Sequence, residues 1–235
     1  MQVDLRILRF DPEQDTRPHW ERYKVEAEPT DRVLDLLHRG EVRPGRHACT
    51  FRRSCAHGIC GSDAMLINGR NGWPARSASI SSVGARMTVA PAAGSAGREG
   101  PRGRHGGLLR QVPAGHALPR RRGAGSGAGT APVAGRGRAR YDDTTKCILC
   151  AACTSSCPSF WAQPEYIGPA AIVNAHRFIF DSRDEAADER LEILAERDGV
   201  WHCRTIFNCV DACPRGIKIT QAILEVSGAI VERRT

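Results

Sequence analysis

A run of cysteines at residues 147–158, CILCAACTSSCP, constrains this chain more than any other feature. Its four cysteines are spaced C-x2-C-x2-C-x3-C and a proline follows them: Cys147, Cys150, Cys153, Cys157 and Pro158. In this pattern three neighbouring thiolates hold one iron–sulfur cluster, while the fourth thiolate serves a second cluster. A second group of cysteines is therefore expected elsewhere in the chain.

The second group lies at residues 203–214 and again ends in a proline. It consists of Cys203, Cys209, Cys213 and Pro214. A repeat of the first run would place a cysteine at position 206, where the chain has Ile206. Because an aliphatic side chain cannot donate a thiolate to iron, we expect a [3Fe–4S] cluster on Cys157, Cys203 and Cys209. A [4Fe–4S] cluster is expected on the remaining four cysteines, Cys147, Cys150, Cys153 and Cys213.

Length and cysteine content limit the class of protein. A chain of 235 residues can form two modest domains, and its ten cysteines are clustered as metal ligands are, rather than spread as a disulfide framework. Structural zinc sites are the alternative use of C-x2-C groups. The chain shows neither an N-terminal export signal nor a run of about 18 apolar residues, so we expect membrane contact only through partner subunits.

Basic charge is concentrated in one part of the chain. The formal net charge is +8, and residues 74–140 hold twelve arginines against a single acid, Glu99. The two ends are therefore mildly acidic, and we expect no nucleic-acid partner. The alternatives for this Gly/Arg-rich stretch are a disordered linker and an RNA-binding segment.

The N-terminal residues read as a small sheet with one helix. Residues 2–10 alternate in the manner of a strand, residues 20–27 read as the second strand of a hairpin, and residues 32–38 read as a helix. Cys55 and Cys60 follow at C-x4-C, the spacing of a plant-type [2Fe–2S] loop. The third ligand position holds Asp63, whose carboxylate can either ligate iron or accept backbone N–H bonds.

The C-terminal residues read as helices around the cysteine groups. Helices are expected from Gly168-Pro169 onward, over residues 184–198 and from Thr220 onward. His176 lies on the core face of the first of these helices, where a hydrogen-bonded core histidine is the favoured interpretation over a ligand.

Four segments resemble the iron–sulfur subunit of succinate dehydrogenase and the related fumarate reductase. They are SCAHGICGSDAM, KCILCAACTSSCPSFW, GPAAIVNAHRFIFDSRDE and CRTIFNCVDACPRGI. The resemblance implies an α+β chain, with a plant-type (β-grasp) [2Fe–2S] ferredoxin domain at residues 1–73 and an all-α bacterial-type ferredoxin domain at residues 141–235.

The resemblance also implies a function. Electrons would pass from a flavoprotein (FAD) subunit through [2Fe–2S], [4Fe–4S] and [3Fe–4S] clusters to a membrane quinone, ubiquinone or menaquinone, in the tricarboxylic acid cycle. The chain would supply no catalytic residue. It would lie peripherally on the cytoplasmic face of the bacterial inner membrane, through membrane-anchor subunits. Fumarate reductase, running in reverse, is the alternative. The quinone-site candidates implied are Pro158, Ser159, Trp161 and Ile206, with subunit packing as the alternative role of Trp161. This chain departs from many members at Ala162 and from some at Arg204, where they have a tryptophan and a histidine. Arg204 is a further candidate, because it could supply positive charge for a semiquinone or form an inter-subunit salt bridge.

One departure from the family pattern affects the [2Fe–2S] site. The family has its fourth cysteine in a segment like L-A-C-K, whereas this chain has Trp73-Pro74-Ala75-Arg76 and no cysteine between Cys60 and Cys147. Codons for Trp-Pro-Ala, read one base earlier, permit Leu-Ala-Cys with the cysteine at position 75. Residues 74–140 also lack aromatic residues and lysine. We therefore interpret residues 40–48 and 74–140 as out-of-frame translation, expect the middle segment to be irregular, and treat Cys49 as an incidental thiol.

Overall fold

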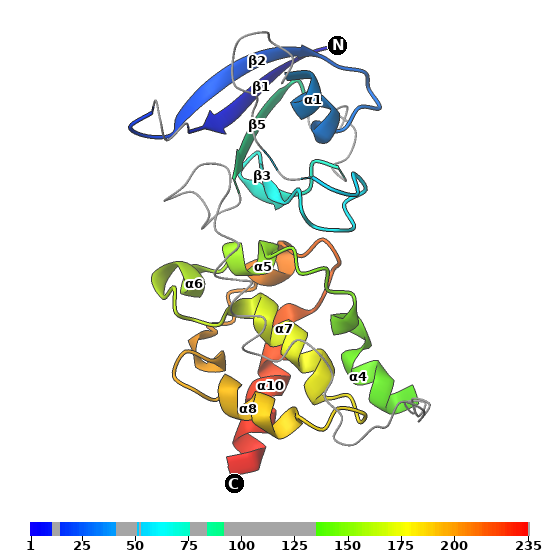
Figure 1. Ribbon diagram of the computed structural model, residues 1–235, viewed down its shortest axis with the longest axis vertical. Coiled ribbons are helices and arrows are strands. Elements are labelled where there is room, and N and C mark those ends of the chain that lie inside the picture. The colour runs from blue at the N-terminus through cyan, green and yellow to red at the C-terminus, as the bar shows by residue number, and fades with distance from the viewer. Residues whose placement is uncertain (11–14, 41–50, 52, 76–83, 92–134, 235) are drawn as a thin grey trace. The chain divides into compact units, whose positions relative to one another are not determined.

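The computed structural model describes residues 1–10, 15–40, 51, 53–75, 84–91 and 135–234 (Figure 1). These residues form two compact units. Unit 1 comprises the described residues up to Pro91 together with Ile148–Ser155, and unit 2 comprises residues 135–147 and 156–234. Among the helices described, none combines the length and apolar content needed to cross a bilayer.

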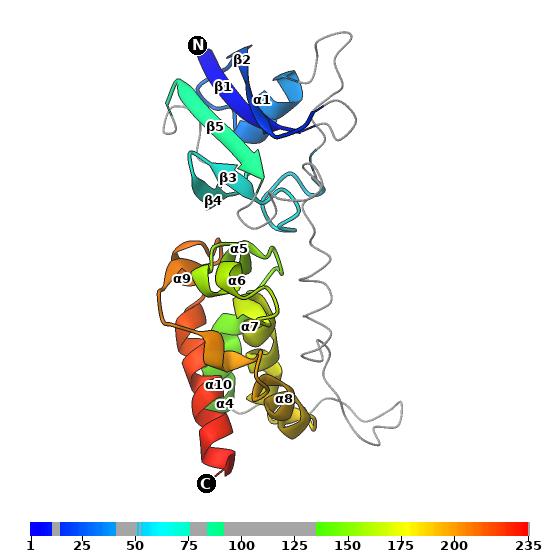
Figure 2. The same cartoon turned by 90° about the vertical axis from the view of Figure 1, so that its left-hand side faces the viewer.

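Unit 1 is built on a five-stranded mixed sheet with strand order β2-β1-β5-β3-β4 (Figure 2). The strands are β1 (Gln2–Arg9), β2 (His19–Glu26), β3 (Met65–Ile67), β4 (Arg70–Gly72) and β5 (Arg86–Pro91). Strands β1 and β2 pair antiparallel, which confirms the predicted hairpin, while β5 runs parallel to β1 and antiparallel to β3.

The core of unit 1 lies between this sheet and helix α1 (Val33–Gly40), which packs against it (Figure 1). Alternate residues of β1 are buried, as expected for a strand with one covered face. The helix buries Val33, Leu36 and Leu37 in the same cluster. Each such side chain contributes about 1.5–3 kcal/mol when fully buried. The predicted helix at residues 32–38 is therefore confirmed.

Strand β5 corrects one expectation. The middle segment was expected to be irregular, and this is wrong for residues 86–91, which pair with β1 in the register Leu5 to Met87 and Ile7 to Val89. Met87 and Val89 are buried, so the alternation in RMTVAP is that of a half-buried strand. The expectation also fails for residues 135–140, which are helical. Most of the residues that we interpret as out of frame lie outside the described residues, at 41–48, 76–83 and 92–134.

Unit 2 is a set of helices with α7 (Gly168–Ile179) at its centre. Helix α7 packs against α4 (Gly135–Thr145), α8 (Ala187–Leu194) and α10 (Ile219–Arg234). The shorter elements of this unit are α6 (Pro158–Ala162), a 3-10 helix (Val200–His202) and α9 (Asn208–Asp211). The short helix α5 (Ala152–Ser155) belongs to unit 1. Helices predicted from residues 168 and 220 onward are confirmed.

The predicted helix over residues 184–198 is wrong at its ends, because helix α8 covers only residues 187–194. The carboxylate of Asp184 accepts the backbone N–H of Ala186 at 3.0 Å and pairs with the buried Arg190 at 3.0 Å. An aspartate bonded to a backbone N–H two residues ahead favours a turn over a continued helix, so the helix starts after it.

His176 lies in the core of unit 2, as predicted. Its Nδ1 is 3.2 Å from Thr144 Oγ1 and its Nε2 is 3.1 Å from Glu225 Oε2. The imidazole therefore links α7 to α4 and to α10, and the interpretation of His176 as a hydrogen-bonded core residue is confirmed.

Candidate iron–sulfur centres

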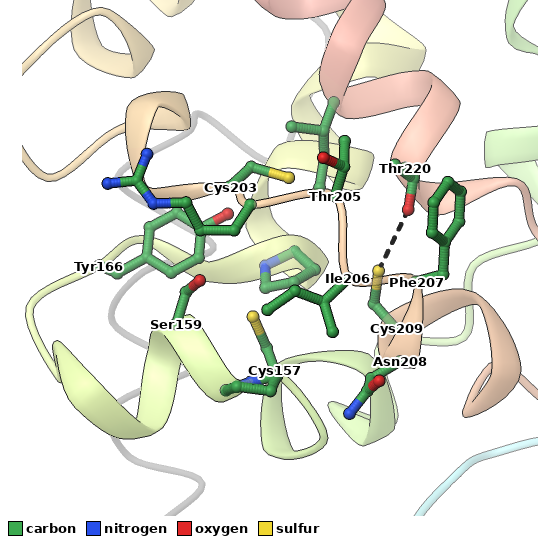
Figure 3. Close-up of a pocket in the computed structure, with 14 residues that line it drawn as sticks. Cys157, Ser159, Tyr166, Cys203, Thr205, Ile206, Phe207, Asn208, Cys209 and Thr220 are labelled. Carbon is green, nitrogen blue, oxygen red and sulfur yellow. Dashed lines mark hydrogen bonds between the residues drawn. The ribbon is translucent and has the colours of Figure 1, made fainter.

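Three cysteines of unit 2 line one pocket (Figure 3). Cys157 immediately precedes α6, Cys203 follows the 3-10 helix, and Cys209 lies in α9. Ile206 lines the same pocket. The structure thus brings together the three predicted ligands of a [3Fe–4S] cluster and the aliphatic residue that replaces a fourth.

The backbone around the pocket explains why these side chains converge. Thr205 and Phe207, on either side of Ile206, have φ values of +52° and +69°. This left-handed conformation is costly for a β-branched or bulky residue, so the surrounding structure must hold the loop in this shape. Ser156 Oγ donates to the carbonyl of Asn208, and Asn208 Nδ2 donates to the carbonyl of Ser156, both at 3.3 Å. This reciprocal pair holds the neighbours of Cys157 and Cys209 side by side.

Cys209 is the most enclosed of the three thiols. Burial raises the pKa of its thiol, against a hydrogen bond with Thr220 that lowers it. The Thr220 hydroxyl oxygen lies 3.6 Å from the Cys209 sulfur. An anionic sulfur at this position therefore requires compensation, which iron and a hydroxyl donor both supply.

The donor set fits a cluster better than a single ion. None of the cysteines in the described residues forms a disulfide. Within the same residues, no group of three or more His, Cys, Asp or Glu side chains is close enough to hold one metal ion. A zinc site needs its sulfurs about 2.3 Å from a common centre, whereas a cuboid cluster spreads its ligands around several irons. Three thiols around one pocket, with an isoleucine in place of a fourth, fit [3Fe–4S].

Four of the five predicted quinone-site residues line this pocket: Pro158, Ser159, Arg204 and Ile206. The fifth, Trp161, lies on α6, is 51% exposed and is not part of this lining. Ile206 and Phe207 are also about half exposed, at 49% and 55%. The mouth of the pocket therefore carries apolar surface beside one guanidinium group.

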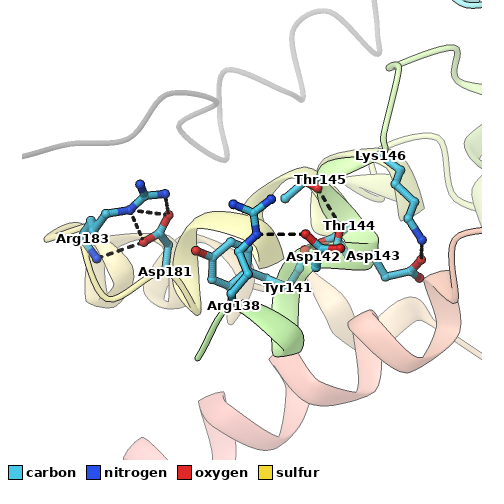
Figure 4. A network of polar contacts seen from close by, with 9 residues as sticks. All are labelled: Arg138, Tyr141, Asp142, Asp143, Thr144, Thr145, Lys146, Asp181 and Arg183. Atoms are coloured by element: carbon cyan, nitrogen blue, oxygen red, sulfur yellow. Dashed lines mark hydrogen bonds and ion pairs between the residues drawn. The ribbon is translucent and has the colours of Figure 1, made fainter. Parts of the chain in front are cut away.

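Asp143 connects the segments that lead into Cys147 and out of Cys213. Its carboxylate accepts Lys146 Nζ at 2.8 Å (Figure 4) and the backbone N–H of Lys218 at 2.8 Å. Burial raises the pKa of this carboxyl, but the bonds from Lys146 and Lys218 outweigh it, so the pKa lies below its usual value. Asp143 thus remains an anion that holds two backbone segments of unit 2 together.

The predicted [4Fe–4S] ligands belong to both units. Cys147 and Cys213 lie in unit 2, and Cys213 Sγ accepts the backbone N–H of Ile217 at 3.5 Å. Cys150 and Cys153 lie in unit 1, where Cys153 is buried on α5. The common site of these four thiolates stays a prediction.

The loop around Cys55 has the form of a thiolate cradle. The backbone N–H groups of Cys60, His57 and Ile59 point at Cys55 Sγ from 3.3–3.4 Å and lower the pKa of this thiol to about 6. Gly58 and Gly61 have φ values of +68° and +71°, which only glycine adopts without strain. Amides turned toward a sulfur are what an iron-bound cysteine in a [2Fe–2S] loop requires.

Asp63 and Ala75 occupy the third and fourth ligand positions of this loop. Both are buried, and Asp63 Oδ2 accepts the Ala75 backbone N–H at 2.9 Å. Among the described atoms, Asp63 Oδ1 is buried without a hydrogen-bond partner, and an iron ion would satisfy it. The Ala75 methyl group cannot ligate. Among the described residues, the loop therefore supplies at most Cys55, Cys60 and Asp63, which do not fit a [2Fe–2S] cluster held by four protein ligands.

Comparison with known proteins agrees with both sets of cysteines. A family model described as "2Fe-2S iron-sulfur cluster binding domain" matches residues 4–96, and one described as "4Fe-4S dicluster domain" matches residues 139–214. The first match continues past Ala75 through β5, which agrees with the sheet of unit 1.

Relatives match over most of the chain. The mitochondrial succinate dehydrogenase [ubiquinone] iron-sulfur subunit 1 of Oryza sativa subsp. japonica is 39% identical over 217 residues, which are 90% of this chain and 76% of that protein. The succinate dehydrogenase iron-sulfur subunit of Coxiella burnetii is 32% identical over 228 residues, 94% of this chain and 93% of that protein. A chain of the Mycobacterium smegmatis Sdh1 complex in the apo form has the same fold, with a TM-score of 0.80 at 22% identity, covering 99% of this chain and 96% of that chain. Because the rice and Coxiella proteins are 39% and 32% identical over 90% and 94% of this chain, the chain belongs to the family of succinate dehydrogenase iron–sulfur subunits.

Proposed function

We propose that this chain is the electron-transferring subunit of a succinate:quinone oxidoreductase, and that it passes electrons from a flavoprotein subunit to a membrane quinone during succinate oxidation. The observation that carries the proposal is the convergence of Cys157, Cys203 and Cys209 on one pocket that also contains Ile206. Iron–sulfur clusters, when bound, supply one-electron chemistry at a potential set by their surroundings. The family named above supports the direction from succinate to quinone.

The chain's own residues hold and insulate the redox groups. Cys157, Cys203 and Cys209 hold [3Fe–4S], and the Ile206 side chain leaves one corner without a protein ligand. Four further cysteines of the two C-terminal groups hold [4Fe–4S]: Cys147, Cys150, Cys153 and Cys213. Pro158, Ser159 and Arg204 form the side of the pocket where a quinone head group would dock, with the guanidinium available to its oxygen.

Partners follow from the same proposal. The dicarboxylate site lies on the flavoprotein subunit, and membrane-anchor subunits cover the apolar mouth formed by Ile206 and Phe207, both about half exposed. This arrangement holds the chain peripherally, at the cytoplasmic face of a bacterial inner membrane. In the chain as it stands, Ala75 provides no ligand at the fourth position of the [2Fe–2S] site.

The test is anaerobic co-expression of the chain with its partner subunits, followed by electron paramagnetic resonance of the oxidised complex. We expect a [3Fe–4S] signal that disappears in Cys203→Ser and persists in Cys49→Ser, the matched control at a cysteine assigned to no cluster. A colourless, iron-free protein, or a signal indifferent to Cys203→Ser, would overturn the proposal. Comparing succinate-driven quinone reduction with quinol-driven fumarate reduction separates the two directions.

A further inference from the structure

Thr220 lies at the start of α10, against the pocket that holds Cys157, Cys203 and Cys209. It is 2% exposed, and its Oγ1 lies 3.6 Å from Cys209 Sγ (Figure 3). A cysteine sulfur bound to iron carries no proton. The hydroxyl is therefore the donor whenever Cys209 acts as a ligand.

The position of this hydroxyl is restricted. Its neighbours Ile219, Ala222 and Ile223 on the first turn of α10 are buried, and Ile223 lines the same pocket. Threonine is also β-branched, so few rotamers are open to it in a helix. A buried hydroxyl that cannot reach water keeps the partner it has, which at this position is the Cys209 sulfur.

We propose that Thr220 is a positioning residue that raises the reduction potential of the [3Fe–4S] site through its hydrogen bond to Cys209 Sγ. This inference rests on the proposed function. Adding one electron to the iron increases the negative charge on its thiolate ligands, and a hydroxyl proton at the sulfur stabilises that charge. The proton stays on Thr220 and the iron–sulfur bond stays intact. The electron comes from the preceding carrier in the chain and leaves to the quinone.

A packing role alone predicts a different outcome. Valine has nearly the shape of threonine but no hydroxyl, so Thr220→Val keeps the packing and removes the donor. Serine keeps the hydroxyl and loses the methyl group. Ser227→Ala is the matched control, because the Ser227 hydroxyl donates to the Ile223 carbonyl at 3.0 Å on the same helix and is not part of the pocket lining.

The experiment is an anaerobic redox titration of the whole complex, with the [3Fe–4S] resonance as the readout. We expect Thr220→Val to lower the reduction equilibrium constant about three- to tenfold, which is about 28–59 mV for a one-electron couple. Thr220→Ser should stay close to the unmodified complex, and Ser227→Ala should not move the potential. An unchanged potential in Thr220→Val overturns the inference, and so does an equal shift in Thr220→Ser.

A second pair keeps the inference testable if Thr220→Val does not assemble. Thr220→Ser and Thr220→Ala both lack the γ-methyl group and differ only by the hydroxyl, so alanine should show the lower potential. Equal potentials in this pair overturn the inference. Absence of any [3Fe–4S] signal in the unmodified complex would instead be a failure of the proposed function.

Discussion

The backbone N–H of Ala75 donates to Oδ2 of Asp63 at 2.9 Å, and both residues are buried. The Ala75 carbonyl in turn accepts Arg32 Nη1 at 2.7 Å. The backbone at position 75 is therefore held on both sides, beside the third ligand position of the [2Fe–2S] loop. The side chain at this position is a methyl group where the family pattern has a thiol.

Ala75→Cys should restore the [2Fe–2S] site. The backbone at this position is already fixed by Asp63 and Arg32, so a thiolate is the missing part. We expect the paramagnetic resonance of a one-electron-reduced [2Fe–2S] cluster to appear, together with two additional irons per chain, the iron content of that cluster. Ala75→Ser is the matched control, because its hydroxyl is similar in size but is a poorer iron ligand. An unchanged iron content in Ala75→Cys would contradict this account of the site.

Asp63→Asn, made together with Ala75→Cys, tests whether Asp63 is a ligand. The amide oxygen of asparagine can still accept the backbone N–H at position 75, so the substitution keeps the hydrogen bond that positions the loop. Because Oδ1 is buried without a hydrogen-bond partner among the described atoms, we expect ligation, and hence loss of the restored [2Fe–2S] signal. A normal signal in the double variant would show that Asp63 only braces the loop.

Ile206→Cys should convert the [3Fe–4S] site to [4Fe–4S]. Ile206 lines the pocket together with the three cysteines, so a thiolate placed there can hold a fourth iron. The oxidised [3Fe–4S] resonance should vanish while the iron content rises by about one per chain. Ile206→Val, which keeps an aliphatic side chain, should retain the resonance. Persistence of the [3Fe–4S] resonance in Ile206→Cys would instead mean that Ile206 does not face the position of a fourth iron.

Arg190→Met should strongly destabilise unit 2. The side chains of Arg190 and Asp184 are both fully buried and pair at 3.0 Å, so the substitution removes the guanidinium that neutralises a buried carboxylate. Such a loss costs about 3–5 kcal/mol in the free energy of unfolding. Anaerobic urea unfolding measures it. Adding Asp184→Asn should recover much of the loss.

Arg183→Met is the comparison for this pair. Arg183 pairs with Asp181 at 2.6 Å, and its side chain is 35% exposed although that of Asp181 is only 10% exposed, so water screens the guanidinium side of this pair. Its loss should be much smaller than that of Arg190→Met. Equal losses in the two variants would mean that burial of Arg190 is not what makes its pairing important.

The convergence of Cys157, Cys203 and Cys209 on one pocket could be predicted from sequence more reliably than the contacts around that pocket. Cys157, Cys203 and Cys209 follow from spacing, because only certain atoms bind iron. Strand β1 and helix α1 follow from periodicity. Strand β5 was missed because the Gly, Ala, Arg and Pro content around it hid the alternation of Met87 and Val89. The contact of Thr220 with Cys209 depends on how α10 packs against α9, and no local pattern encodes that distance.

The His176 network predicts the response of unit 2 to acid. Burial lowers the pKa of His176 below 6.5, outweighing the bond to Glu225 that raises it. For Glu225, burial raises the pKa, but bonds from His176, Gln221 and Arg140 outweigh it and leave the pKa below 4.5. The positive charge of Arg140 also lowers the pKa of His176, whereas the negative charge of Asp143 raises it.

Because both folded-state pKa values are depressed, the unfolded chain binds protons more readily than the folded chain at mildly acidic pH. The free energy of unfolding should therefore be highest above pH 6.5, the ordinary pKa of histidine, and should decrease as the pH falls below that value. It should decrease further as the pH falls below 4.5, the ordinary pKa of glutamate. Each proton contributes a slope of at most about 1.4 kcal/mol per pH unit. Anaerobic urea unfolding between neutral and mildly acidic pH measures this slope. His176→Gln should flatten it just below pH 6.5. An identical slope in His176→Gln and the unmodified chain would show that His176 does not take up the proton.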